Sequence, residues 1–171
     1  MDQIRAATVD DAASIAHVHV ASWRSTYHGI VPQPYLDGLD EAERTEDWRT
    51  WLTAGTAVFV AERNSAVVGF IAGGAIRQAV EGYDAEVYTV YLLQQFQRQG
   101  IGIGLLNTLA VHLRNEGLNS MVVWVLEDNV SAGFYTASGA VRVGSKEMDI
   151  GGKTLLAVAY GWPRIGELIH R

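Results

Sequence analysis

The chain has 171 residues, 49% of them hydrophobic and 19% charged, and no apolar run of the about 18 residues that a membrane-spanning helix needs. Its opening residues do not resemble a signal peptide, and its net charge of −6 argues against non-specific binding to nucleic acid, so we expect a cytoplasmic protein with one domain over residues 1–171. The absence of cysteine excludes disulfides, Cys-based zinc sites and a thiol nucleophile; any thioester chemistry must use a thiol that a ligand brings.

The first third of the chain predicts a strand and two helices. Residues 3–8 (QIRAAT) alternate like a short strand, and Thr8 or Asp10 can cap the helix that follows. The apolar stripe of that helix consists of Ala12, Ile15, Ala16, His19 and Trp23. Residues 27–39 are expected to form turns, because Pro32 and Pro34 block continuation of a helix.

The second helix is predicted over residues 40–52 (DEAERTEDWRTWL). Asp40 is placed to cap it, and Trp48, Trp51 and Leu52 are expected on its buried face. The tryptophans are interpreted as core anchors.

Strands dominate the remainder. Residues 57–63 and 66–78 flank a short turn and predict a hairpin, and residues 85–93 (AEVYTVYLL) predict a longer strand. Helices are expected at 101–116 and 129–138, a buried strand at 120–126, and a closing hairpin at 140–162 that turns at Gly151-Gly152. This order predicts an α+β fold in which a predominantly antiparallel, twisted sheet of about seven strands, with one parallel pair, is flanked by four helices.

Three glycines, Gly100, Gly102 and Gly104, stand where the helix at 101–116 begins. Unpaired backbone N–H groups at a helix N-terminus attract anions, and glycine lets a ligand approach the backbone closely. Close packing of the helix on the sheet is the alternative explanation, above all for Gly104. A P-loop is excluded because Gly-Lys-Ser/Thr is missing, and a dinucleotide fingerprint because the spacing is G-x-G-x-G without a second βαβ unit.

Four motifs in order resemble the GNAT superfamily of N-acetyltransferases. QRQGIG (97–102), directly after VYTVYLL, is similar to the Q/R-x-x-G-x-G/A signature of that family. IRAATVDDAASIAHVHVASW resembles its first strand and helix, VVGFIAGG its third strand, and LEDNVSAGFYTASGAV its fifth strand and fourth helix. The resemblance covers essentially the whole chain.

The resemblance implies acetyl-CoA as co-substrate. It implies that the helix N-terminus holds the pyrophosphate and that the pantetheine arm pairs with the strand at 85–93. The residues implied in binding are Val90, Tyr91, Leu92, Arg98, Gln99, Gly100, Ile101, Gly102, Ile103, Gly104 and Asn129. Gln94 departs from the family, many members of which have proline there; this leaves the loop less rigid.

Glu86 and Tyr135 are the catalytic residues that the resemblance implies. A primary amine must lose a proton before it attacks a thioester, and Glu86 matches the general base of some members, although others use a chain of waters. Tyr135 matches the tyrosine that protonates the leaving thiolate. Strand alternation predicts that Glu86 shares a face with Tyr88, Val90 and Leu92. Asn129 is expected to contact the CoA arm or to cap the following helix.

The acceptor is expected to be the primary amine of a small molecule, such as a polyamine or an amino-sugar antibiotic. Aromatic and acidic side chains suit a cation, and the residues expected to bind it are Trp23, Tyr27, His28 and Asp84. Acetylation of a protein N-terminus or lysine, and a CoA-binding regulatory module without turnover, are the alternatives. The family also implies a bacterial source and a homodimer, and no metal site is expected, because His17, His19 and His28 lack metal-ligand spacing.

Overall fold

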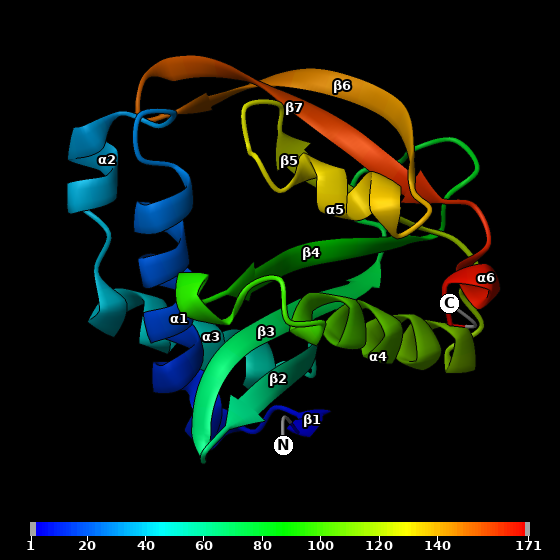
Figure 1. Ribbon diagram of the computed structural model, residues 1–171, viewed down its shortest axis with the longest axis horizontal. Helices are drawn as coiled ribbons and strands as arrows, with labels where there is room; N and C mark the ends of the chain where they lie inside the picture. Colours follow the sequence, from blue (N-terminus) through cyan, green and yellow to red (C-terminus); the bar gives the residue numbers. More distant parts are fainter. Residues whose placement is uncertain (1–2, 170–171) are drawn as a thin grey trace.

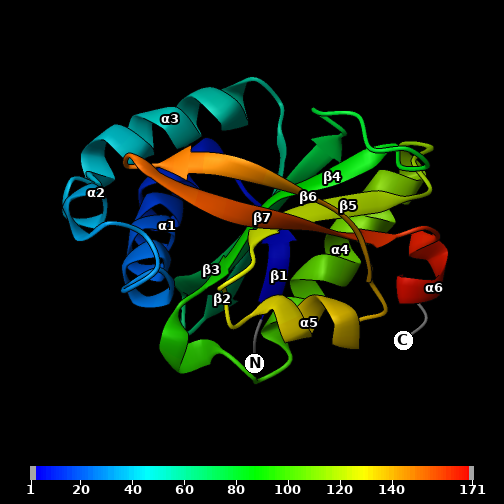
Figure 2. The same cartoon turned by 90° about the horizontal axis from the view of Figure 1, so that it is seen from above.

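The computed structural model describes residues 3–169, whose seven strands form one mixed sheet in the order β1-β2-β3-β4-β5-β7-β6 (Figures 1 and 2). Among the strands of these residues, only β4 and β5 pair in parallel. The strands are β1 Gln3–Ala6, β2 Ala57–Arg63, β3 Ala66–Ala75, β4 Ala85–Leu92, β5 Met121–Leu126, β6 Val141–Ile150 and β7 Lys153–Trp162. The predicted α+β class and its one parallel pair are confirmed.

Six α-helices occur in the described residues, where the sequence predicted four. They are α1 Ala12–Thr26, α2 Gln33–Asp37, α3 Glu41–Thr53, α4 Ile101–Asn115, α5 Ala132–Ala137 and α6 Ile165–Ile169, with 3-10 turns η1 Val9–Asp11 and η2 Gln94–Phe96. The segment 27–39 is rich in turns, as predicted, but it also contains α2, because Pro34 lies in the first turn of that helix, where the missing N–H has no intrahelical partner to lose. None of the described helices is both long and apolar enough to cross a membrane.

The helices cover both faces of the sheet. One core cluster packs α4, with residues of α5 and α6, against β2–β5, and a second packs α1 and α3 against β2 and β3. A third cluster joins the end of α1 and α2 to β5 and the β6–β7 hairpin. Figure 1 shows this hairpin reaching over to α2.

The cap of α3 is confirmed, whereas one of its predicted core residues is exposed. Asp40 accepts a hydrogen bond from the backbone N–H of Glu43 at 2.9 Å. Trp48 is buried, but Trp51 is 38% exposed, so its placement in the core is wrong. Trp48 fills the contact of α3 with the core, and Trp51 packs edge-on against the Trp48 ring with its outer side toward solvent.

A β-bulge in β4 decides which side chains reach each face of the sheet. Ala72 pairs with Thr89, but the next residue of β3, Gly73, pairs with Val87, so Tyr88 is the extra residue. Val87 before the bulge and Val90 after it both pack under α4. The alternation predicted for this strand is therefore wrong: Glu86 and Tyr88 lie on the α1 side of the sheet, whereas Val90 and Leu92 lie on the α4 side.

Candidate active site

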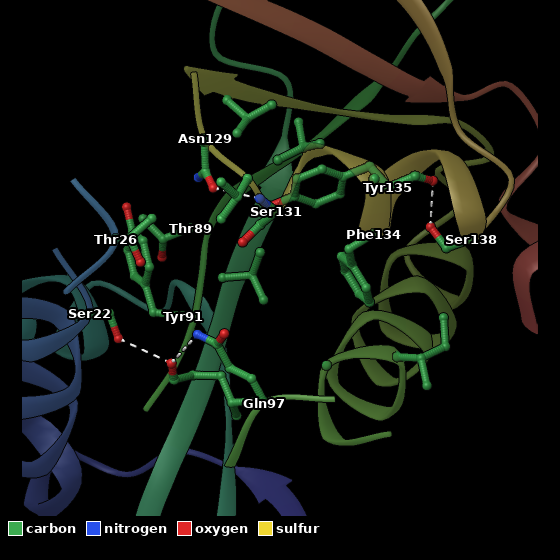
Figure 3. Close-up of a pocket in the computed structure, with 18 of the residues that line it drawn as sticks. Ser22, Thr26, Thr89, Tyr91, Gln97, Asn129, Ser131, Phe134, Tyr135 and Ser138 are labelled. Carbon is green, nitrogen blue, oxygen red and sulfur yellow. Dashed lines mark hydrogen bonds between the residues drawn. The ribbon is translucent and has the colours of Figure 1, made fainter. Parts of the chain in front are cut away.

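A cavity of about 720 Å³ lies where β4 and β5 separate. The two strands pair only over Ala85–Val87 and Met121–Val123, and β4 then continues to Leu92 without a partner on that side. Figure 3 shows side chains of α1 on one side of the cavity and those of α5 on the other. A ligand can therefore enter the sheet between these strands.

The edge of β4 that faces the cavity carries backbone N–H and C=O groups that can hydrogen-bond to a ligand. The carbonyl of Leu92 accepts hydrogen bonds from Ser22 Oγ at 3.5 Å and Gln97 Nε2 at 3.2 Å, so it points away from β3. Alternation along the strand places the N–H and C=O of Val90 on the same edge. A ligand with amide groups can hydrogen-bond there as an added strand would.

The turn into α4 forms a cradle of backbone amides at one end of this edge. Arg98 and Gly100 have φ angles of 60° and 85°, in the left-handed region that glycine adopts without strain. Gly100 is the N-cap of α4 and makes no side-chain cap hydrogen bond, so the first N–H groups of the helix keep their capacity for a ligand. The helix dipole adds to their attraction for an anion such as pyrophosphate.

Gly102 and Gly104 serve different purposes. Gly102 lines the cavity, and a Cβ added to it would meet only the ring of Phe134, at 3.4 Å. At Gly104 an added Cβ would lie 2.8 Å from Ile4 Cδ1. Gly104 thus permits close approach of α4 to β1 and does not line the cavity.

The other residues predicted to bind the cofactor also divide into two groups. Those in the cavity wall are Val90, Tyr91, Leu92, Arg98, Gly100, Gly102, Ile103 and Asn129. Gln99 and Ile101 do not line it. The side chain of Gln99 accepts a hydrogen bond from Arg63 and donates one to the carbonyl of Gln95, and Ile101 is buried in the core.

Tyr135 lies in the cavity wall. It projects from α5 and stacks against Tyr160 of β7, with ring centroids 6.0 Å apart. Burial, with a smaller contribution from Tyr27, raises the pKa of Tyr135, so its hydroxyl keeps the proton at neutral pH. A protonated hydroxyl in this position can donate to a bound ligand.

Glu86 is buried on the α1 side of the sheet but does not line the cavity. Its carboxylate accepts hydrogen bonds from Arg77 Nη2 at 2.8 Å, Arg77 Nε at 3.3 Å and the backbone N–H of Arg77 at 3.1 Å. The pairing with Glu86 in turn raises the pKa of Arg77. The Arg77 guanidinium also lies 4.1 Å from the ring centroid of Tyr88, which does line the cavity.

The residues predicted to bind the acceptor are not all brought together. Tyr27 lines the cavity; Trp23 packs against it at 4.6 Å between ring centroids. His28 lies at a separate shallow pocket, with Nδ1 3.1 Å from Gln33 Oε1. Asp84 joins the start of β4 to the segment before β5: burial opposes its ionisation, but hydrogen bonds from the backbone N–H groups of Asn119 and Ser120 outweigh burial and lower its pKa.

Hydrogen bonds tie side chains on both sides of the cavity in place. Trp23 Nε1 donates to the hydroxyl of Tyr91 at 2.8 Å. Asn129 Nδ2 donates to Tyr27, at 3.3 Å, and Asn129 Oδ1 accepts from the backbone N–H of Ser131, which is the N-cap of α5. Asn129 therefore supports the start of α5 and lines the cavity as well.

Several cavity residues were not predicted from the sequence. The main ones are Ser22, Thr26, Tyr88, Thr89, Gln97, Trp124, Ser131 and Phe134. Phe134 stands in the GFY motif beside Tyr135, which could have indicated it. Tyr88 and Thr89 could not be placed without knowing the bulge, and Trp124 follows an apolar pattern that indicates only burial.

The site combines three features: a parallel pair of strands that separates, a cradle of backbone amides beside the opening, and a free strand edge that leads from the cradle to a protonated tyrosine. Together these features define a CoA-dependent acyltransferase. The model of the Acetyltransferase (GNAT) family matches residues 20–140 of the chain. The chain belongs to this family, and it is an N-acetyltransferase with acetyl-CoA as its co-substrate.

Similar proteins agree with this assignment. The chain is 43% identical over 168 residues to the uncharacterized N-acetyltransferase YuaI of Bacillus subtilis, covering 98% of this chain and 96% of that protein. It is 29% identical over 171 residues to a phosphinothricin N-acetyltransferase of Streptomyces viridochromogenes, covering 96% and 84%. The structure of yncA from Salmonella typhimurium with its cofactor acetyl-CoA has the same fold, with a TM-score of 0.73 at 22% identity over 96% of this chain and 94% of that one.

Proposed function

We propose that the protein transfers the acetyl group of acetyl-CoA directly to the primary amine of a small molecule. The free edge of β4 at Val90 supports the binding of the pantetheine arm, and the cradle at Gly100 and Gly102 supports that of the pyrophosphate. Arg98 and Asn129 line the same cavity and contribute at either side of the arm.

The reaction needs one proton removed and one supplied. The amine nitrogen attacks the thioester carbonyl carbon, the new C–N bond forms as the C–S bond breaks, and the amine loses a proton while the thiolate gains one. Glu86 is the proposed base; because it does not line the cavity, the proton reaches it through a water. Tyr135 is the proposed acid, since burial keeps its hydroxyl protonated.

Closure of the acceptor side is the observation that carries the choice of a small molecule. Lys153 Nζ, at the start of β7, donates to the carbonyl of Ile30 at 2.9 Å, and Tyr27, Leu36 and Ile150 pack in one apolar cluster. The hairpin is thereby attached to the α1–α2 segment. A peptide would need an open groove between them, so acetylation of a protein is the less favoured alternative.

The charges of the residues around the acceptor decide which class of amine can bind. Polyamines and amino sugars were expected because aromatic and acidic side chains suit a cation. Backbone amides, however, already hold the carboxylate of Asp84, and Arg77 holds that of Glu86. The relative named for phosphinothricin makes that compound a further candidate acceptor. Trp23 and Tyr27 are retained as acceptor-side residues, whereas His28 and Asp84 have no contact with the cavity that would support the role.

A CoA-binding regulatory module without turnover is the alternative from a different class. Such a module would not need a buried carboxylate and a buried tyrosine on the two sides of the gap between β4 and β5. Cytoplasmic location and a homodimer stay predictions.

Release of free thiol tests the proposal. Purified protein is mixed with acetyl-CoA and, in turn, with spermidine, kanamycin, phosphinothricin, the common amino acids and a lysine-containing peptide. We expect thiol release above background with at least one small amine and none with the peptide. Binding of acetyl-CoA without release for any acceptor would favour the regulatory module, and release only with the peptide would favour a protein acetyltransferase.

A further inference from the structure

Two cationic side chains lie against aromatic residues of the cavity wall, on the acceptor side. The guanidinium of Arg77 is 4.1 Å from the ring centroid of Tyr88, and the ammonium of Lys146 is 4.1 Å from that of Trp124. Both aromatic residues line the cavity. Both cations thus lie at the rim of the cavity, beside rings that an acceptor inside it would touch.

The fold brings the two cations to one rim from distant parts of the sequence. Arg77 lies in the loop between β3 and β4, and Lys146 lies on β6. Lys146 Nζ donates to the side-chain oxygen of Gln78, the neighbour of Arg77, at 2.6 Å. This hydrogen bond joins β6 to the β3–β4 loop, and Lys146 thereby contacts the sequence neighbour of Arg77.

Both cations keep donors for a further partner. Arg77 uses Nε and Nη2 for Glu86, and in the described part of the chain nothing accepts a hydrogen bond from its Nη1. Lys146 has three donors, and one of them binds Gln78. Arg77 neutralises Glu86, whereas in the described residues Lys146 contacts a neutral amide and an aromatic ring. Alternation turns the adjacent Glu147 to the other face of the hairpin.

The cations are too far from the cradle to bind the pyrophosphate. Tyr88 and Leu92 are four residues apart on β4, a distance of about 13 Å along an extended strand, and the cradle lies beyond Leu92. The partner of this rim must therefore belong to the acceptor.

We propose that the acceptor is a primary amine that also carries a carboxylate, an amino acid or a close analogue, and that Arg77 and Lys146 hold that carboxylate. This inference rests on the proposed function. A carboxylate between a guanidinium and an ammonium makes charge-assisted hydrogen bonds, which fix its position as well as its charge. The amine of the same molecule is then directed past Tyr88 toward the gap between β4 and β5.

Matched pairs of acceptors test the substrate class. Each amino acid that supports thiol release is compared with its carboxamide, and spermidine and kanamycin are measured beside them. The amine of the amide is less basic, so more of it is unprotonated at neutral pH, and poorer reaction of the amide cannot come from protonation. We expect kcat/KM at least about tenfold higher for the acid than for the amide.

Variants locate the contact. Lys146→Met should raise KM for the acid about tenfold, leave KM for acetyl-CoA unchanged and reduce the preference for the acid over the amide. Arg77→Lys should raise KM for the acid by a smaller factor. Lysine keeps the positive charge beside Glu86 but lacks the planar guanidinium that can bind a carboxylate with two hydrogen bonds. Arg142→Gln is the matched control: it removes an exposed cation from the same strand, paired with Glu127 at 3.8 Å, and should leave all constants unchanged.

Three outcomes would overturn the inference: equal reaction of acid and amide, faster reaction of spermidine or kanamycin than of every amino acid, or an unchanged preference in Lys146→Met. Absence of thiol release with every amine tested would instead contradict the proposed function itself. The two failures are therefore distinguishable.

Discussion

Glu86 and Val90 project from opposite faces of the sheet, although they stand four residues apart on one strand. The bulge at Tyr88 is the cause, because it inserts one residue between two consecutive partners on β3. Glu86 therefore lies on the side of α1, where we propose that the acceptor binds. Val90 lies on the side of α4, where the acetyl-CoA arm is expected, so we propose that the two substrates meet in the gap between β4 and β5.

Tyr135→Phe should lower kcat about a hundredfold and leave the affinity for acetyl-CoA within about twofold, because the hydroxyl acts only when the thiolate leaves. Steady-state kinetics and calorimetric titration with acetyl-CoA measure the two effects. Tyr160→Phe is the matched control, since that ring stacks on Tyr135. Equal losses in kcat and affinity would show a packing role for Tyr135.

Glu86→Gln should lower kcat/KM about a hundredfold at neutral pH and recover part of the loss as pH rises, because more of the amine is then already deprotonated. Glutamine keeps one oxygen, which can accept the hydrogen bonds from the backbone N–H and Nε of Arg77, so the fold is expected to persist. The pH profile of kcat/KM is the measurement, with Glu127→Gln as a control at an exposed carboxylate. A variant with the activity and pH profile of the native protein would assign the base to another group.

Gly102→Glu should weaken acetyl-CoA binding at least about a hundredfold, because a carboxylate would stand in the cradle that receives the pyrophosphate. Gly102→Gln has nearly the same size without the charge, and it should weaken binding less. Titration of both variants with acetyl-CoA separates charge from bulk. If the two lose affinity equally, crowding against Phe134 explains the loss and the electrostatic role of the cradle does not hold.

His19 should make the protein less stable in mild acid. Burial, and to a smaller extent Arg44, lowers its pKa from the ordinary 6.5 to about 4, so the unfolded chain binds a proton that the folded chain does not. Its contribution is complete above pH 6.5 and disappears as pH falls to about 4, a loss of about 3 kcal/mol in the free energy of unfolding. Denaturant unfolding at several pH values measures the loss.

His19→Phe is the matched variant, and its stability should depend less on pH in that range. Asp11, whose pKa the hydrogen bond from Arg5 lowers to about 2, acts only in stronger acid, below its ordinary value of 3.8. Equal pH dependence of the variant and the native protein between pH 4 and 6.5 would exclude His19 as the cause.

The sequence predicts the features of this fold that depend on local pattern. Alternation gives the strands, Asp40 indicates the start of α3, and the glycines after VYTVYLL indicate the helix that binds an anion. Each of these follows from residues close together in the chain.

What the sequence could not predict depends on partners far away. The bulge at Tyr88 is defined by the register with Gly73, and the partner of Glu86 is Arg77 in the β3–β4 loop. Lys146 of β6 lies over Trp124 of β5 because β7 pairs with both strands and brings them close together. The expectation that Asp84 binds the acceptor missed the backbone N–H groups that hold this carboxylate, since a carboxylate in the sequence does not reveal its partner.

The most direct test of acetyl transfer to a small amine follows both products of one reaction. Free thiol and acetylated acceptor are measured together, by thiol titration and mass spectrometry, with acetyl-CoA and the panel of small amines. We predict that thiol release requires a small primary amine and equals the amount of N-acetylated product. Bound acetyl-CoA that stays intact with every small amine, or thiol release without an acetylated amine, would contradict this account.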